Sequence, residues 1–140
     1  MRSISLKAIL LATLAMFGID IVSGMVLMGV FGELPPNATD EQVRMAAAEL
    51  TRNPGYLKAG LILGTASTVL GGYLVTRLAH SVPYFNALAF GALALLLGML
   101  LPNDLPTWAS VVGFGLTIPA ALLGAYLGKR GARARDERGP

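Results

Sequence analysis

Residues 105–128 read LPTWASVVGFGLTIPAALLGAYLG, a stretch of 24 residues without one charged side chain. A second uncharged stretch covers residues 81–103, and a third covers 59–76. A fourth, 8–32, is interrupted only by Asp20. Together the four stretches hold 90 of the 140 residues but only one of the 19 Lys, Arg, Asp and Glu residues. Because a soluble domain distributes charge along its amphipathic helices, this segregation predicts several membrane-spanning helices.

The predicted fold is an all-α membrane protein, in which residues 1–128 form one bundle of four transmembrane helices. The spans are expected at about 6–31, 56–78, 84–101 and 107–127. Between the first two spans, Thr39-Asp40-Glu41-Gln42 matches a capping box and predicts a short amphipathic helix over about 39–52. Its apolar stripe, which we expect to lie on the membrane surface, consists of Val43, Ala46, Ala47 and Leu50. Residues 129–140 are predicted to form a flexible, basic cytoplasmic tail.

Lys and Arg residues are distributed unequally between the two sides of this predicted bundle. One side carries eight of them: Arg2, Lys7, Arg77, Lys129, Arg130, Arg133, Arg135 and Arg138. The other side carries three: Arg44, Arg52 and Lys58. Positive charge is retained in the cytoplasm, so we expect a multi-pass protein of the bacterial inner membrane with both termini cytoplasmic. Trp108 then marks the outer membrane interface.

Spans 2 and 4 end in similar motifs, GGYLVTR and GAYLGKR. Each motif places Tyr four residues before Arg on one helical face, where the guanidinium can lie over the ring at the inner interface. The two pairs predicted to anchor the spans are Tyr73 with Arg77, and Tyr126 with Arg130. The spans match at a fixed offset of 53 residues, which favours, as a hypothesis, duplication of a helical hairpin.

Small residues recur every four positions along the same two spans. They are Gly60, Gly64, Thr68 and Gly72 on span 2, and Ala120, Gly124 and Gly128 on span 4. Transmembrane helices associate by close packing, so these small faces predict helix–helix contacts. Small faces that no other span of the same chain covers are available to a second copy of the chain or to another membrane protein.

Asp20 is the candidate functional residue, because it is the only ionisable residue inside a predicted span and lies near the membrane midplane. Hydroxyl groups lie at a similar depth on spans 2 and 4: Thr65, Ser67, Thr68 and Thr117. Pro119 has no N–H, so the carbonyl of Gly115 is expected to be free at this level. Two interpretations remain open: a proton or cation site, or a carboxyl that pins two helices together through a hydroxyl.

Several classes of site are excluded by composition. The chain has no Cys and one His, His80, so thiolate zinc sites, iron–sulfur clusters and His-based metal clusters cannot form within it. No nucleophile–base pair or phosphate-binding loop can be assembled, and we therefore expect neither an enzyme nor a cofactor. The basic residues flank apolar spans, which argues for membrane topology and against nucleic acid binding.

Two resemblances arise at these residues. A chain of four spans with a carboxyl in the first resembles small multidrug resistance exporters in architecture only. Those proteins have little bias of Lys and Arg between the two sides of the membrane, whereas this chain has eight on one side and three on the other. They also surround the carboxyl with aromatic residues, whereas only Phe17 is close to Asp20 here. Over most of its length the chain resembles a loose group of uncharacterised small bacterial inner-membrane proteins, which share the ending Gly71-Gly72-Tyr73…Arg77 on span 2. That resemblance implies four spans and no activity.

The sequence thus favours a non-catalytic membrane protein that acts by helix–helix assembly with itself or with a membrane partner. The alternative is a small transporter or channel coupled to protons or cations, with Asp20 as the titrating group.

Overall fold

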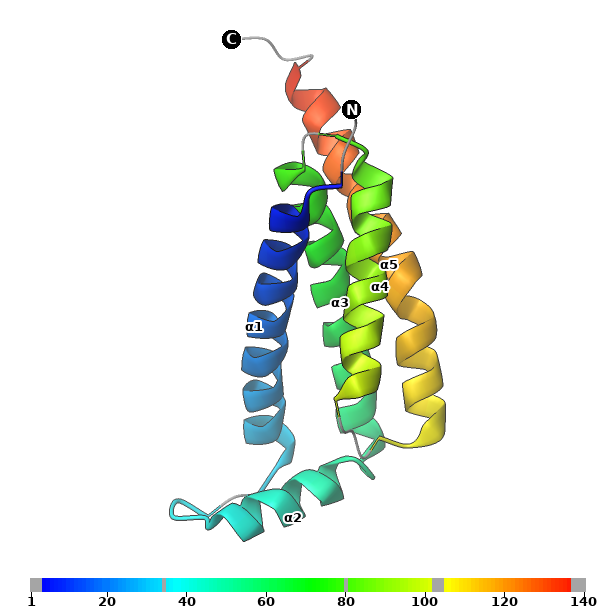
Figure 1. The fold of residues 1–140 in the computed structure, drawn as a ribbon. Helices are drawn as coiled ribbons and strands as arrows, with labels where there is room; N and C mark the ends of the chain where they lie inside the picture. Colours follow the sequence, from blue (N-terminus) through cyan, green and yellow to red (C-terminus); the bar gives the residue numbers. More distant parts are fainter. Residues whose placement is uncertain (1–3, 34, 80, 102–104, 137–140) are drawn as a thin grey trace.

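The computed structural model describes residues 4–33, 35–79, 81–101 and 105–136. These residues form five α-helices: α1 (Leu6–Phe31), α2 (Asp40–Leu50), α3 (Pro54–Leu78), α4 (Pro83–Leu100) and α5 (Thr107–Asp136). All except α2 are long and apolar enough to span a membrane (Figure 1). The predicted fold, four spans with a short helix between the first two, is therefore confirmed. His80, residues 102–104 and the tail residues 137–140 lie outside the described residues.

Local capping interactions set the start of α2 and of α3. The Thr39 hydroxyl accepts the Gln42 N–H, and the Gln42 side chain accepts the Thr39 N–H, so the predicted capping box is present. At α3 the Asn53 side chain accepts the N–H groups of Gly55 and Tyr56. Pro54 occupies the first turn, where its missing N–H costs nothing, and α3 therefore begins two residues before the predicted span.

The fourth span differs from its prediction at the carboxyl end. A flexible tail was expected from residue 129, but α5 continues as a helix to Asp136. Residues 132–135 are Ala-Arg-Ala-Arg, which are among the strongest helix formers, and basic side chains are favoured near a helix C-terminus. A single glycine, Gly131, is too small an interruption to end the helix.

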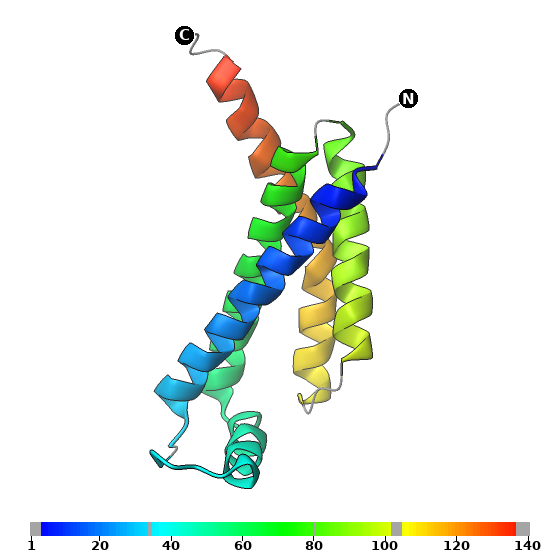
Figure 2. The same cartoon turned by 60° about the vertical axis from the view of Figure 1, so that its left-hand side comes forward.

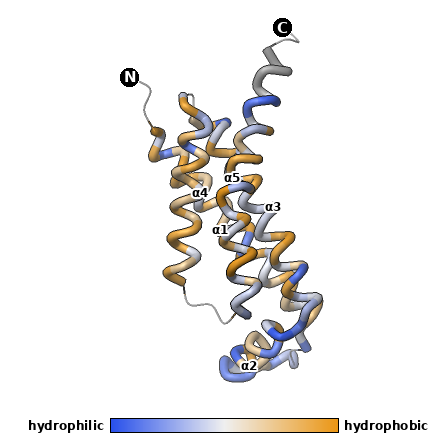
Figure 3. The backbone as a smooth tube through the Cα atoms, turned by 90° about the vertical axis from the view of Figure 1, so that its right-hand side faces the viewer, coloured by the Kyte–Doolittle hydropathy of each residue, from blue (hydrophilic) through white to orange (hydrophobic). Residues whose placement is uncertain are grey.

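The spans alternate in direction, so α3 and α5 run parallel to each other and antiparallel to α1 and α4 (Figure 1). We call the end closed by α2 the α2 end, and the end where α1 begins and α5 finishes the terminal end. Hydrophilic residues gather along α2 and at the terminal end of α5, whereas the body of the bundle is hydrophobic (Figure 3). Large apolar side chains are exposed on the outer face of every span, among them Leu14, Met25, Ile62, Phe85, Met99 and Val111. Such a surface is suited to lipid, and the chain is a multi-pass membrane protein.

The most extensive interface joins α3 and α5. Gly72 lies directly against the backbone of Ala121, and Gly124 lies against the carbonyl oxygen of Val69, so neither position has room for a Cβ atom. Further along, a Cβ at Gly128 would lie 3.1 Å from the side chain of Thr76. These three glycines let the two backbones approach closely, as the small faces of spans 2 and 4 predicted.

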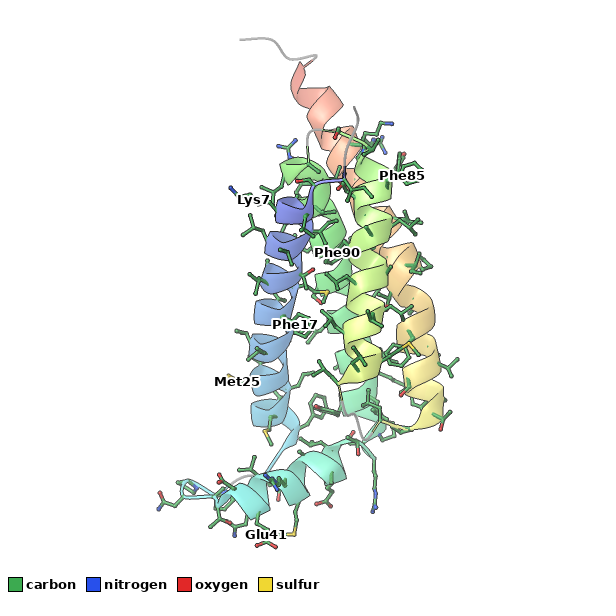
Figure 4. All side chains as sticks on the ribbon, viewed as in Figure 1. Lys7, Phe17, Met25, Glu41, Phe85 and Phe90 are labelled. Carbon is green, nitrogen blue, oxygen red and sulfur yellow. The ribbon has the colours of Figure 1, made fainter. Side chains whose placement is uncertain are left out.

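A second feature of the bundle is that its two halves are packed differently. At the terminal end all four spans share a core centred on Phe90, whose fully buried ring lies over Gly71. Other members of this core are Ala8, Ile9, Ala12, Met16, Val75, Ala79, Ala87, Ala94, Ala121 and Ala125. Towards the α2 end, α1 and α3 diverge from α4 and α5 (Figure 2). Figure 4 shows Phe17 and Phe90 directed between the helices, and Lys7 and Met25 directed outward.

Candidate functional site

A cavity of about 440 Å³ lies where the spans diverge, in the half of the bundle next to α2. All four spans line it, and most of its wall is apolar, with three aromatic side chains: Phe17, Tyr56 and Phe114. The polar residues in the wall are Asp20, Ser23, Thr65, Thr68, Ser110 and Thr117. On the terminal side the cavity ends at the packed core, where Met16 and Ala94 belong to both. Its volume falls in the range of small-ligand sites.

Asp20 is the only carboxylate among the residues that line this cavity. The hydroxyl of Ser67 donates a hydrogen bond of 2.5 Å to Asp20 Oδ1 and also lies 3.0 Å from the carbonyl oxygen of Gly64. Ser67 is buried, whereas Asp20 is half-buried and faces the cavity. One contact therefore ties α1 to α3 and orients the carboxyl towards the cavity.

The threonine hydroxyls at this depth all donate to their own helices. Thr65 donates to the carbonyl of Leu61, Thr68 to that of Gly64, and Thr117 to that of Gly113, at 2.7, 2.8 and 3.0 Å. A hydroxyl whose proton is used in this way offers its lone pairs to any further partner. The polar part of the cavity is consequently rich in hydrogen-bond acceptors, which suits a cation or another donor.

The fold brings together most of the residues that the sequence assigned to the site. Asp20, Thr68 and Thr117 line one cavity, and Ser67 holds the carboxyl. The carbonyl of Gly115 does not join this group, because Gly115 and Pro119 are exposed and neither lines the cavity. They occupy the outer face of α5, turned away from α3.

The small face of span 2 serves two purposes. Gly72 packs against α5, but Gly60 and Gly64 line the cavity, and a Cβ at Gly64 would meet nothing within 4 Å. Gly64 therefore seats no neighbouring helix of this chain, in contrast to its predicted role. The reason is the divergence of the spans, which begins near this level and leaves the glycine facing open space.

Two features of the structure were not predicted. Phe114 and Tyr56 join Phe17 around the cavity, although the sequence placed only Phe17 near Asp20. Asn86 is completely buried and connects the start of α1 to the turn before α4: its Oδ1 accepts the Ser5 N–H at 2.7 Å, and its amide donates to the carbonyls of Ser81 and Val82. The available signal for Asn86 was that it is the only amide side chain in the predicted span 84–101.

The predicted interface residues lie at the two ends of the bundle. At the terminal end the Arg77 guanidinium carbon is 6.0 Å from the centre of the Tyr73 ring. Tyr126 and Arg130 are exposed, and the second cation over a ring is Lys129, whose Nζ lies 5.1 Å from the centre of Tyr84. Trp108 is exposed in the first turn of α5, at the α2 end.

Comparison with known proteins adds no family to this description. No family model matches the chain, and no curated protein or solved structure is significantly similar to it. Within the described residues, no three His, Asp or Glu side chains lie close enough together to hold a metal ion.

The Ser67–Asp20 contact leads to a first prediction. Asp20→Asn should leave the free energy of unfolding within about 0.5 kcal/mol of the wild type, because an amide oxygen also accepts the Ser67 proton. Asp20→Leu should cost about 1 kcal/mol, the usual worth of an interhelical hydrogen bond in a membrane protein. Unfolding of both variants in mixed micelles measures the difference, and equal stability of the two would contradict a structural role for the contact.

Proposed function

We propose that the chain is a non-catalytic protein of the bacterial inner membrane that binds a proton or a small cation at Asp20, with both termini in the cytoplasm. The observation that carries the proposal is the cavity, which Asp20 lines and which ends at the packed core on its terminal side. A carboxyl that only pinned two helices would need no such access. Because the packed core closes the cavity on the terminal side, the site is suited to exchange its cation with a single side of the membrane at a time, as a transporter requires.

The composition of the cavity wall favours a cation over an anion or a neutral solute. Asp20 supplies the one negative charge, and the threonine hydroxyls supply acceptor oxygens. Ca²⁺ takes six to eight oxygen ligands and Mg²⁺ six, usually with carboxylates among them, whereas this wall offers a single carboxylate. A proton, a monovalent ion or an ammonium group fits the wall better.

Helix–helix assembly, the function that the sequence favoured, has less support from the geometry. Gly72, Gly124 and Gly128 pack against other spans of the same chain, so they are not available to a second one. No other span packs against Gly64, which faces the cavity together with Asp20. One substitution, Gly64→Leu, therefore separates the two functions.

The test is carbodiimide labelling of Asp20 in native membranes between pH 5 and 9, with Asp20→Asn as the background. Carbodiimides react with protonated carboxyls, so wild-type labelling should fall as the pH rises. Gly64→Leu should reduce labelling at least about ten-fold, because the new side chain fills the cavity beside Asp20. The matched control is Gly18→Leu, on the outer face of α1, where a Cβ also meets nothing within 4 Å.

Absence of wild-type labelling at every pH would refute an accessible site at Asp20. If Gly64→Leu instead labels normally but changes the native mass of the solubilised particle, the residue belongs to an interface between chains, and assembly becomes the better proposal.

A further inference from the structure

Among the described side chains, four cations lie at the terminal end of the bundle: Lys7 of α1, Arg77 of α3, and Lys129 and Arg130 of α5. We call them the basic rim. Tertiary contacts bring them to one level, because Ser5 is hydrogen-bonded to Asn86 at the start of α4, and Gly128 lies against Thr76 of α3. Lys7, Arg77 and Arg130 are exposed, and Lys129 is half-buried over Tyr84.

The basic rim has no carboxylate at its own level in the described part of the chain. Apart from Asp20 in the cavity, the acidic residues of the described bundle lie at the opposite end: Glu33, Asp40, Glu41 and Glu49. Asp136 is six residues beyond Arg130 on α5, about 9 Å further along the helix axis. Among the described side chains, the rim therefore has no acidic partner at its own level.

Two rim cations are held by aromatic rings. Arg77 lies over Tyr73, and Lys129 lies over Tyr84. A ring face attracts the charge without using up N–H donors, so these donors stay available to an anion. Beside the rim the spans expose large apolar side chains, among them Leu6, Leu78, Phe85 and Leu127. A ligand that complements both the cations of the rim and the apolar side chains beside them has an anionic head and an apolar body.

We propose that the basic rim binds the phosphate headgroups of anionic phospholipids, whose acyl chains lie along the apolar faces of α1, α3, α4 and α5. This inference is independent of any function at Asp20. Phosphate oxygens accept the N–H groups that the rings leave free, and each cation near an anionic headgroup strengthens binding several-fold. Free phosphate would satisfy the charge but not the apolar surface beside it.

The experiment counts lipids retained by the purified, detergent-solubilised protein in native mass spectrometry. Dioleoylphosphatidylglycerol should bind at least about ten-fold more tightly than dioleoylphosphatidylcholine, since only its headgroup carries a net charge. The double variant Arg77→Gln/Lys129→Gln should lose about 30-fold in affinity for phosphatidylglycerol. The matched control, Arg52→Gln/Lys58→Gln, removes two exposed charges from the α2 end and should change the affinity less than two-fold.

Equal losses in the two double variants, or equal affinity of the wild type for both lipids, would overturn the proposal. So would displacement of the lipid by millimolar inorganic phosphate, which would make the rim a site for the free anion. If the rim double variant fails to fold, Arg77→Gln and Lys129→Gln are measured singly, each with an expected loss of about five-fold.

Discussion

Gly124→Leu is expected to destabilise the bundle by about 3 kcal/mol or more. The position lies against the carbonyl oxygen of Val69 and the backbone of Gly72 and Tyr73, so the new side chain meets main-chain atoms that cannot rotate away. Relief requires α3 and α5 to separate, which breaks the most extensive interface of the molecule. The free energy of unfolding in mixed micelles measures the effect.

Gly115→Leu provides the matched control on the same helix. Gly115 is exposed on α5, and a Cβ there meets nothing within 4 Å. The expected change is within about 0.5 kcal/mol, as for other surface substitutions. If both variants are equally stable, the glycines do not set the distance between α3 and α5.

Asn86→Leu is the second variant with a large expected effect, and it should lower the free energy of unfolding by about 2–4 kcal/mol. Leucine has a similar volume, so the substitution leaves no sizeable void, but it leaves the Ser5 N–H and the Ser81 carbonyl without this partner in a partly buried site. Val82 adds to this loss of stability. Its φ of 41° is unfavourable for a β-branched residue, and the Asn86 amide stabilises that conformation by donating a hydrogen bond to the Val82 carbonyl.

Asn53→Leu is the control for Asn86, because the Asn53 side chain also bonds to backbone groups, in this case two N–H groups, but is exposed at the start of α3. Loss of such a helix cap costs about 1 kcal/mol. Hydrogen exchange gives a second readout: Asn86→Leu should accelerate exchange in the first turn of α1 and leave the α3 turn around Ser67 unchanged. Unaltered exchange in α1 would show that Asn86 does not hold that helix.

Depth in the membrane could be predicted from the sequence, whereas the direction in which a residue faces could not. A helix rises about 1.5 Å per residue, so counting from the span ends placed Ser67, Thr68 and Thr117 near the level of Asp20. Thr117 and Gly115 differ by two residues and hence by about 200° around the helix, which puts one on the cavity and the other outside. Only the packing of α5 on α3 decides which of them faces inward.

Features that depend on distant partners were also beyond the sequence. Asn86 bonds to a residue 81 positions away, and no local pattern specifies that pairing. The cavity results from the divergence of the spans at the α2 end, which follows from crossing angles. By contrast, the capping box at Thr39 involves residues three apart, and its prediction is confirmed.

The contact between Asp20 and Ser67 has a consequence for biosynthesis, since 47 positions separate the two residues. At about 5–20 residues per second, a ribosome needs roughly 2–10 s to make that stretch. During this interval the first span enters the bilayer with a carboxyl whose partner does not yet exist. α1 is the most apolar of the four spans, and its flanking Ile, Val and Leu side chains offset the cost of the carboxyl until α3 arrives. The hydrophobicity of α1 thus favours membrane insertion of the nascent chain before the folded bundle exists.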